Sequence, residues 1–209
     1  MEIQYFGANC VRITTKHASV VVDDTLSQQG LKSITKPSDI VLATILEGNE
    51  SQISPQLRID RPGEYEVSGV AILGIAARAH TDEEGKKTAT IFKLTANDIR
   101  LCIAGHIYPD LSDDQLELIG TVDVLVVPVG GNGYTLDATG ALKVIKKIEP
   151  KVVIPVHYAD SKIRYEVPQA SLADALQNMA VDTKDTLPKL KLKNSELPAN
   201  MELIVLDRN

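Results

Sequence analysis

Histidines that follow apolar segments are the residues of this chain best suited to chemistry. His106 comes just after the apolar run at residues 99–104, and His157 follows the run at residues 151–156. His80 opens a polar loop after another apolar segment. A neutral imidazole binds transition metals and exchanges protons near neutral pH. Three histidines placed in this way can therefore form a metal-binding or acid–base site.

The segments that would position these histidines alternate between strand and helix. Runs rich in Val, Ile and Leu cover residues 99–104, 122–129 and 151–156, and helical patterns fill the two intervals between them. Open α/β sheets commonly place binding sites at the ends of their strands. The order strand, helix, strand, helix, strand therefore predicts one site edge that contains His106 and His157.

Capping residues predict where the helices begin. Ser112 can accept a hydrogen bond from the backbone amide of Gln115, and this pair has the form of a capping box at the start of a short helix. Asp137 or Thr135 can cap a second helix, which Pro150 ends. A third helix is predicted after Ser171, through about residue 180.

The N-terminal part of the chain is predicted to consist of strands. The predicted strands are at residues 3–6, 10–14, 19–23 and 40–44. The paired acids Asp23 and Asp24 lie at the end of the third strand, where carboxylates either hold a metal or, more commonly, organise a loop.

Two segments near the C-terminus, residues 187–192 and 201–206, predict a hairpin. The first contains alternating Lys and Leu from Lys189 to Lys193. This alternation is typical of an edge strand with one solvated face, and it is the only basic cluster of note in the chain.

Composition restricts the class of protein. The 209 residues carry 28 acidic and 22 basic side chains, a net charge of −6, with 4% aromatic residues and no Trp. This balance disfavours nucleic acid as a partner.

No apolar run approaches the roughly 20 residues that span a membrane, and the first residues lack a basic leader. Cys10 and Cys102 are expected to be buried apolar residues. We expect one domain over residues 1–209, in a reducing cytoplasm.

Five groups of motifs occur in a fixed order along the chain. They are Tyr5-Phe6-Gly7 with Cys10, Val21-Val22-Asp23, Pro62-Gly63-Glu64-Tyr65-Glu66-Val67, Val127-Pro128-Val129-Gly130-Gly131 with Thr135-Leu136-Asp137-Ala138, and Val153-Ile154-Pro155-Val156-His157-Tyr158. In this order they resemble the metallo-β-lactamase superfamily, and within it small bacterial proteins similar to the ascorbate-metabolism lactonases. The resemblance implies an αββα sandwich of two mixed β-sheets flanked by helices, an α/β fold whose active site lies along one edge.

The main metal motif of that family is not matched. Family enzymes carry His-x-His-x-Asp-His after a buried strand that ends in Thr, and here that strand ends at Thr44. The four ligand positions then fall on Ile45, Glu47, Asn49 and Glu50, none of which is the expected residue. Ile45 has no lone pair, and Glu47 and Glu50 offer carboxylate oxygens in place of imidazole nitrogens.

The later ligand positions of the family are matched in part. The resemblance places His80 at the next histidine ligand and His157 at the last one, while His106 stands where the family has a metal-bridging Asp. A neutral histidine cannot bridge two ions, because only one ring nitrogen carries a lone pair. Three of the four histidines are therefore expected to converge on the site.

Two functions follow from this pattern. The first is a pseudoenzyme that keeps the fold, has no cofactor, and binds a small molecule or a protein. The alternative is a hydrolase of esters, lactones, amides or phosphodiesters with one Zn or Mn ion on His80, His106 and His157, and with Glu47 or Glu50 as a further ligand or general base. Metal-free chemistry is a third option, and the oligomeric state is left open, a homo-oligomer included.

Overall fold

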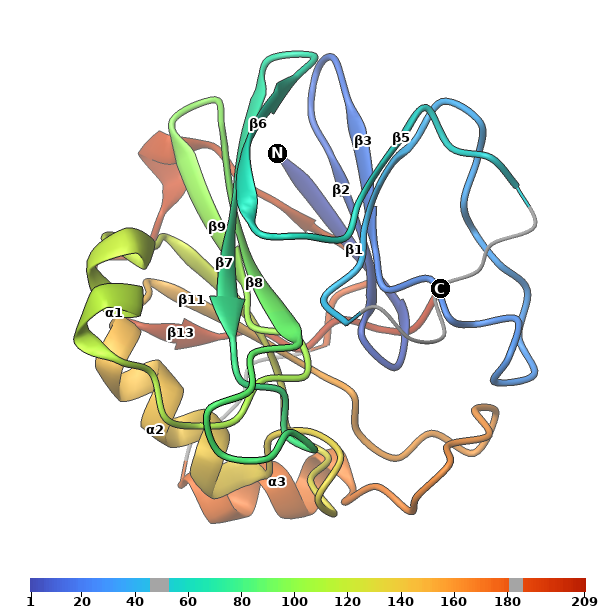
Figure 1. Cartoon of the computed structure of the whole chain (residues 1–209), viewed down its shortest axis with the longest axis vertical. Helices are drawn as coiled ribbons and strands as arrows, with labels where there is room; N and C mark the ends of the chain where they lie inside the picture. The colour runs from blue at the N-terminus through green and yellow to red at the C-terminus, as the bar shows by residue number, and fades with distance from the viewer. Residues whose placement is uncertain (46–52, 181–185) are drawn as a thin grey trace.

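Two β-sheets packed face to face, with helices on one side, form the architecture of this computed structural model (Figure 1). The structure describes residues 1–45, 53–180 and 186–209. Each sheet contains both parallel and antiparallel neighbours. The prediction of two mixed sheets flanked by helices is therefore confirmed.

The first sheet has the strand order β12-β1-β2-β3-β4-β5. Strands β1 to β3 form the predicted antiparallel meander, and β4 and β5 extend it in parallel. The bounds are β1 (Glu2–Gly7), β2 (Cys10–Thr14), β3 (Ser19–Val22), β4 (Ile40–Leu42), β5 (Leu57–Ile59) and β12 (Leu190–Lys191).

The second sheet has the order β13-β11-β10-β9-β8-β7-β6, and its parallel part, β9 to β11 with β13, carries the predicted site edge. Strands β10 and β11 are buried at every residue, as expected when a sheet is covered on both faces. The bounds are β6 (Gly63–Val67), β7 (Val70–Ala77), β8 (Ala89–Ala96), β9 (Ile99–Ile103), β10 (Val124–Pro128), β11 (Val152–Val156) and β13 (Glu202–Leu203).

The predicted C-terminal hairpin is wrong. Strand β12 pairs with β1 in the first sheet, and β13 pairs with β11 in the second. A short 3₁₀ helix, Asn194–Glu196, lies in the connection between them. The alternation of Lys and Leu correctly indicated an edge strand, because Leu190 is buried and Lys191 is exposed. Alternation within a strand does not reveal its partner, since partners are selected by the open sheet edges available.

Apolar side chains form one core between the sheets and another beneath the helices. Ile13, Phe92 and Ile154 lie in the first core, and Val127 and Val144 lie in the second. In Figure 1 the helices gather beside the second sheet, where they cover its outer face. The helices are α1 (Asp113–Ile119), α2 (Ala138–Ile148) and α3 (Leu172–Met179).

Loop residues cover part of the outer face of the first sheet. Leu26 packs there with Cys10 and Val41. One oxygen of the buried Asp24 carboxylate accepts hydrogen bonds from the backbone amides of Ile34 and Thr35, at 2.9 and 2.8 Å. The interpretation of Asp24 as an organiser of this loop is therefore confirmed.

A buried ion pair fixes the far end of the same loop. Asp39 is 1% exposed, and its Oδ1 lies 2.9 Å from Nη1 of Arg12. Arg12 also donates to the carbonyl of Ile34 and to the hydroxyl of Ser19. Charge-assisted hydrogen bonds of this kind are stronger than neutral ones. They hold the loop against the sheet before the chain enters β4.

The cysteines bear out a simpler expectation. Cys10 and Cys102 are both buried and free, as predicted. Burial raises the pKa of the Cys102 thiol to about 12, so it stays protonated and behaves as a small apolar side chain. Among the described residues, no helix is long and apolar enough to cross a membrane.

The three predicted helix caps are confirmed. Ser112 accepts from the amide of Gln115, and the side chain of Gln115 accepts from the amide of Ser112, which completes the capping box of α1. Asp137, and not Thr135, caps α2 by accepting from the amide of Gly140 at 2.7 Å. Ser171 caps α3.

Replacing Ser112 with Ala is expected to lower the free energy of unfolding by about 1 kcal/mol, because it removes the acceptor for a helix amide. Urea denaturation followed by circular dichroism measures the change. Ser195→Ala is the matched control, since Ser195 is exposed and does not cap a helix. Equal effects of the two substitutions would show that the capping box contributes nothing.

Candidate functional site

A cavity of about 200 Å³ lies at the strand ends that the sequence indicated. His106 follows β9 and His157 follows β11, and their ring centroids lie 5.4 Å apart. Both rings line this cavity, and residues from the loops after β3 and β11 complete its wall. The lining residues are Ala8, Asn9, Thr25, Gln28, Gln29, Ile45, Thr81, His106, Tyr134, His157, Arg164, Tyr165, Glu166, Val167 and Gln169.

The hydrogen bonds of His157 determine which of its nitrogens carries the proton. Its Nδ1 lies 3.1 Å from Oε1 of Gln169, which can only accept, so Nδ1 is the donor. The amide of Gln169 is held in this orientation because its Nε2 donates to the carbonyl of Val167 at 3.0 Å. The lone pair of His157 is therefore on Nε2.

His157 also has an unusual backbone. Its φ is +54°, a left-handed conformation that costs free energy for a residue with a side chain. The preceding strand and the contact of its amide with the carbonyl of Ala8, at 2.8 Å, hold it there. Burial, with repulsion from His106, lowers the pKa of His157 to about 3. The ring is therefore neutral at physiological pH.

Thr44 and Asn9 hold the ring of His106. Thr44 donates its hydroxyl to Oδ2 of Asp23 at 2.6 Å, which leaves the Thr44 oxygen able to accept from Nδ1 of His106 at 3.2 Å. Nδ2 of Asn9 lies almost equally far from both ring nitrogens, 3.1 Å from Nδ1 and 3.2 Å from Nε2, so it packs against the ring and is not aligned with the lone pair of Nε2. Burial lowers the pKa of His106 to about 4, so this ring is neutral as well. The lone pair of His106 is therefore on Nε2, next to the Asn9 amide.

Glycine allows the two histidine loops to approach each other. A Cβ on Gly130 would overlap the carbonyl oxygen of His157 and Oε1 of Gln169. Gly130 is therefore required where the loop after β10 passes the loop after β11. Its carbonyl accepts from the amide of Ala170 at 2.8 Å, which ties the Gln169 segment to the same place.

His80 lies close to this site along the backbone, but its side chain lines a different hollow. Its amide donates to the carbonyl of His106 at 2.9 Å. Its ring lies beside Tyr108, at a centroid distance of 5.7 Å, in a hollow that Thr135 also lines. The structure thus brings His106 and His157 together in one cavity and places the His80 ring outside it.

The other predicted site positions follow β4. Ile45 is half-buried, forms an isolated bridge with Ala89 and lines the cavity. Glu47, Asn49 and Glu50 lie outside the described residues. Their roles as ligand positions or general base stay predictions.

Sequence reasoning missed most of the polar residues around the histidines. Asn9 had a weak signal, since it stands in the turn Gly7-Ala8-Asn9 within the resemblance to the family. Tyr134 and Tyr165 flank the His157 ring at centroid distances of 5.9 and 5.1 Å. Gln169 has no signal in the sequence, because its position depends on how a long irregular loop folds back.

The family implies a metal ion, and the described residues do not fit one. Among residues 1–45, 53–180 and 186–209, no group of three or more His, Cys, Asp or Glu side chains is placed to hold a metal. His157 and His106 each carry one lone pair, on Nε2, and the amide nitrogen of Asn9 lies 3.2 Å from Nε2 of His106. Two imidazoles alone are too few for a zinc or manganese centre.

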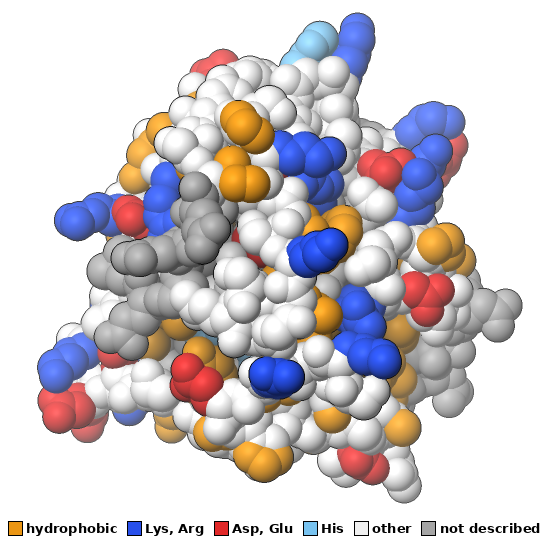
Figure 2. All heavy atoms as spheres, turned by 90° about the vertical axis from the view of Figure 1, so that its right-hand side faces the viewer, with side chains coloured by type: hydrophobic (Ala, Val, Ile, Leu, Met, Phe, Trp, Pro, Cys, Tyr) orange, Lys and Arg blue, Asp and Glu red, His pale blue; other side chains and the backbone are white. Residues whose placement is uncertain are grey.

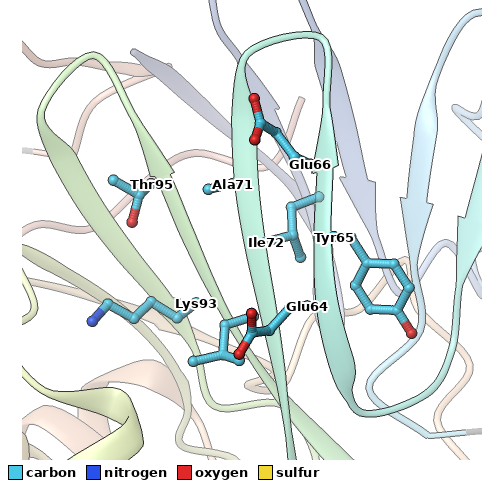
Figure 3. Close-up of a pocket in the computed structure, with 8 residues that line it drawn as sticks. Glu64, Tyr65, Glu66, Ala71, Ile72, Lys93 and Thr95 are labelled. Carbon is cyan, nitrogen blue, oxygen red and sulfur yellow. The ribbon is translucent and has the colours of Figure 1, made fainter.

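A second hollow, of about 440 Å³, lies on the outer face of strands β6 to β8 (Figure 3). Glu64 and Glu66 on β6 and Lys93 and Thr95 on β8 line it, and Figure 3 shows the two pairs on either side of β7. Lys93 is engaged there, since its Nζ donates to the carbonyl of Ile119. None of the histidines lines this hollow.

Comparison with known proteins identifies the class. A family model described as a beta-lactamase superfamily domain matches residues 2–157, so this chain belongs to that superfamily. A UPF0173 metal-dependent hydrolase of Pyrococcus horikoshii is 33% identical over 103 residues, which are 46% of this chain and 44% of the relative. A UPF0173 metal-dependent hydrolase of Thermococcus onnurineus is 29% identical over 100 residues, with the same coverage. The matched region thus spans less than half the length of these relatives.

Solved structures extend the similarity over the whole chain. The crystal structure of a proposed zinc-dependent hydrolase of the metallo-β-lactamase superfamily from Thermotoga maritima has a TM-score of 0.75 and 26% identity, and the match covers 99% of this chain and 98% of that one. An isothiocyanate hydrolase from Delia radicum gut bacteria gives a TM-score of 0.65 at 9% identity, covering 100% and 97%. The second similarity concerns the fold alone.

Proposed function

We propose that this protein is a metallo-β-lactamase-fold homologue that binds a small molecule in the histidine cavity and does not hydrolyse it with a metal ion. The observation that carries the proposal is the hydrogen-bond network of His106. Its Nδ1 contacts the hydroxyl of Thr44, and Nδ2 of Asn9 lies 3.1 and 3.2 Å from its two ring nitrogens, so the residue at the position of the family's bridging Asp is packed among protein groups and acts as a structural group. The family ligand positions at Ile45, Glu47, Asn49 and Glu50 would then have been lost.

The surface near the cavity favours a small molecule over a protein as the ligand. Figure 2 shows the face on the right-hand side of Figure 1, where the loop residues between β3 and β4 lie. Among the residues coloured there, hydrophobic side chains occur in small separate groups, with Lys and Arg spread between them. Large continuous apolar patches on a protein surface commonly mark sites of contact with other proteins. Free thiols suit a reducing compartment, so we place the protein in the cytoplasm.

His157 supports a second candidate function. Its Nδ1 donates to Gln169, and metal-ligating histidines commonly donate their other ring nitrogen in this manner. Several relatives are named metal-dependent hydrolases. A hydrolase of esters, lactones, amides or phosphodiesters with a single Zn or Mn ion at His157 is therefore the alternative. It requires ligands beyond those that the described residues bring together.

Metal analysis separates the two functions. The protein is purified without chelator, incubated with Zn²⁺ or Mn²⁺ and desalted. Inductively coupled plasma mass spectrometry is then expected to find far less than one metal ion per chain. His157→Gln is compared with His17→Gln, an exposed histidine elsewhere on the chain. One metal ion per chain that disappears in His157→Gln and persists in His17→Gln would overturn the proposal and establish the alternative.

A further inference from the structure

Two buried oxygen atoms in the histidine cavity lack a hydrogen-bond donor among the described residues. They are Oδ1 of Asn9 and Oε1 of Gln29, and both residues line the cavity. Asn9 is only 3% exposed, and its Nδ2 is directed at the His106 ring. Buried amide oxygens are almost always paired in native proteins. Their orphan state indicates that something else supplies the donors.

Gln29 is held in place by its backbone. Its amide donates to the carbonyl of Leu26 at 3.1 Å, and its carbonyl accepts from the amide of Arg164 at 3.0 Å. The second contact joins the loop after β3 to the loop after β11, and residues of both loops line the cavity. The unpaired Gln29 oxygen is thus part of a fixed wall.

His157 adds a third acceptor to the same cavity. Because its Nδ1 donates to Gln169, its Nε2 can only accept. Asn9, Gln29 and His157 come from three separate segments, and all three line one space of about 200 Å³. A molecule that satisfies them must present several hydrogen-bond donors.

The charges around the cavity argue against an anion. Burial lowers the pKa of both histidines and keeps their rings neutral, and the buried carboxylate of Asp23 lies 3.9 Å from Nδ1 of His106. Arg164 and Glu166 contribute one charge of each sign to the lining. A carboxylate or phosphate would therefore enter a space without net positive charge, where burial of an anion is unfavourable.

We propose that the cavity binds a small neutral molecule that carries several hydroxyl groups, a linear polyol or a compound with the same array of hydroxyls. The inference rests on the proposed function, because it assigns the ligand class of the same site. The volume of the cavity corresponds to roughly seven water molecules at about 30 Å³ each. This volume lies below the usual range of pockets that bind drug-sized ligands. The ligand is accordingly the size of a sugar alcohol of four or five carbons.

Matched five-carbon probes test the proposal. Ribitol carries a hydroxyl on every carbon, 1,5-pentanediol keeps only the terminal ones, and glutarate replaces these with carboxylates. Saturation-transfer NMR and calorimetry at low millimolar concentration are expected to show saturable binding of ribitol. Binding of the diol is expected to be weaker by about tenfold or more, since it lacks the central donors. Glutarate is expected not to bind.

Two leucine substitutions localise the effect. Gln29→Leu removes an acceptor at nearly constant volume and is expected to weaken ribitol binding by about tenfold. Gln177→Leu, at an exposed position of α3, is the matched control and is expected to bind ribitol as the parent protein does. Thermal unfolding of both variants verifies that they are folded.

The outcomes separate this inference from the proposed function. Absence of saturable ribitol binding, equal affinity for the diol, tighter binding of glutarate, or an unaltered affinity in Gln29→Leu would each overturn the ligand class. Metal content is measured independently of polyol binding. A stoichiometric metal would refute the non-metal function even if ribitol bound, and failed ribitol binding in metal-free protein would refute the ligand class alone.

Discussion

Acidification from pH 7 to pH 5 is expected to lower the free energy of unfolding by about 3 to 4 kcal/mol through His106 and His157. In the folded protein, burial lowers the pKa of His106 to about 4, and burial with repulsion from His106 lowers the pKa of His157 to about 3. An unfolded histidine titrates near a pKa of about 6.5.

The direction follows from proton binding. Above the unfolded pKa, both states carry neutral rings, and stability is independent of pH. As the pH falls below about 6.5, the unfolded chain takes up two protons that the folded chain refuses, so unfolding becomes easier. The loss levels off when the pH passes the folded pKa of about 4 for His106 and about 3 for His157.

Urea denaturation of chelator-treated protein at several pH values between 7 and 5 measures this dependence. His106→Gln and His157→Gln should each be less stable at pH 7 but should each lose about half of the pH dependence. His17→Gln, at an exposed position, should retain all of it. A parent protein whose stability stays constant over this pH range would show that the two rings are not buried in neutral form.

Gly105→Ala is expected to destabilise the protein by about 3 kcal/mol or more. Gly105 has a φ of +65°, and a Cβ there would lie 2.5 Å from Oγ1 and 2.6 Å from Cγ2 of Thr44. Thr44 cannot move away freely, because its amide and hydroxyl both donate to Asp23. The substitution therefore disturbs the whole network behind His106.

Gly85→Ala provides the matched control. Gly85 has a φ of +87°, but no atom lies within 4 Å of the position that its Cβ would take. Only the backbone strain applies there, about 1 kcal/mol. Thermal and urea unfolding of both variants should therefore differ by about 2 kcal/mol. Similar losses for both would mean that contact with Thr44 adds nothing to the requirement for glycine at Gly105.

Local features of the fold could be predicted because their causes are close in sequence. Ser112 and Gln115 are three residues apart, and their reciprocal hydrogen bonds need no distant partner. The apolar runs before His106 and His157 likewise identify buried strands by composition alone. The sequence could therefore predict which strand ends carry the histidines.

Side-chain directions in the site could not be predicted, because they depend on contacts between distant segments. The amide of His80 meets the carbonyl of His106, yet its ring turns toward Tyr108. The orientation of the His157 ring depends on Gln169, which lies twelve residues further along an irregular loop. Pairing of β12 with β1 similarly joins Leu190 to Ile3, a choice that no local pattern contains.

Strand β1 and the turn that follows it depend on segments from much later in the chain. Lys191 is the partner of Glu2, and the amide of Asn209 reaches the carbonyl of Tyr5 at 3.0 Å. The amide of His157 also donates to the carbonyl of Ala8, next to the turn that carries Asn9. While the ribosome is still extending the chain, β1 has one open edge and the Asn9 turn has no opposite wall. The histidine cavity therefore cannot form before residues 157–169, which contribute much of its lining, have been synthesised.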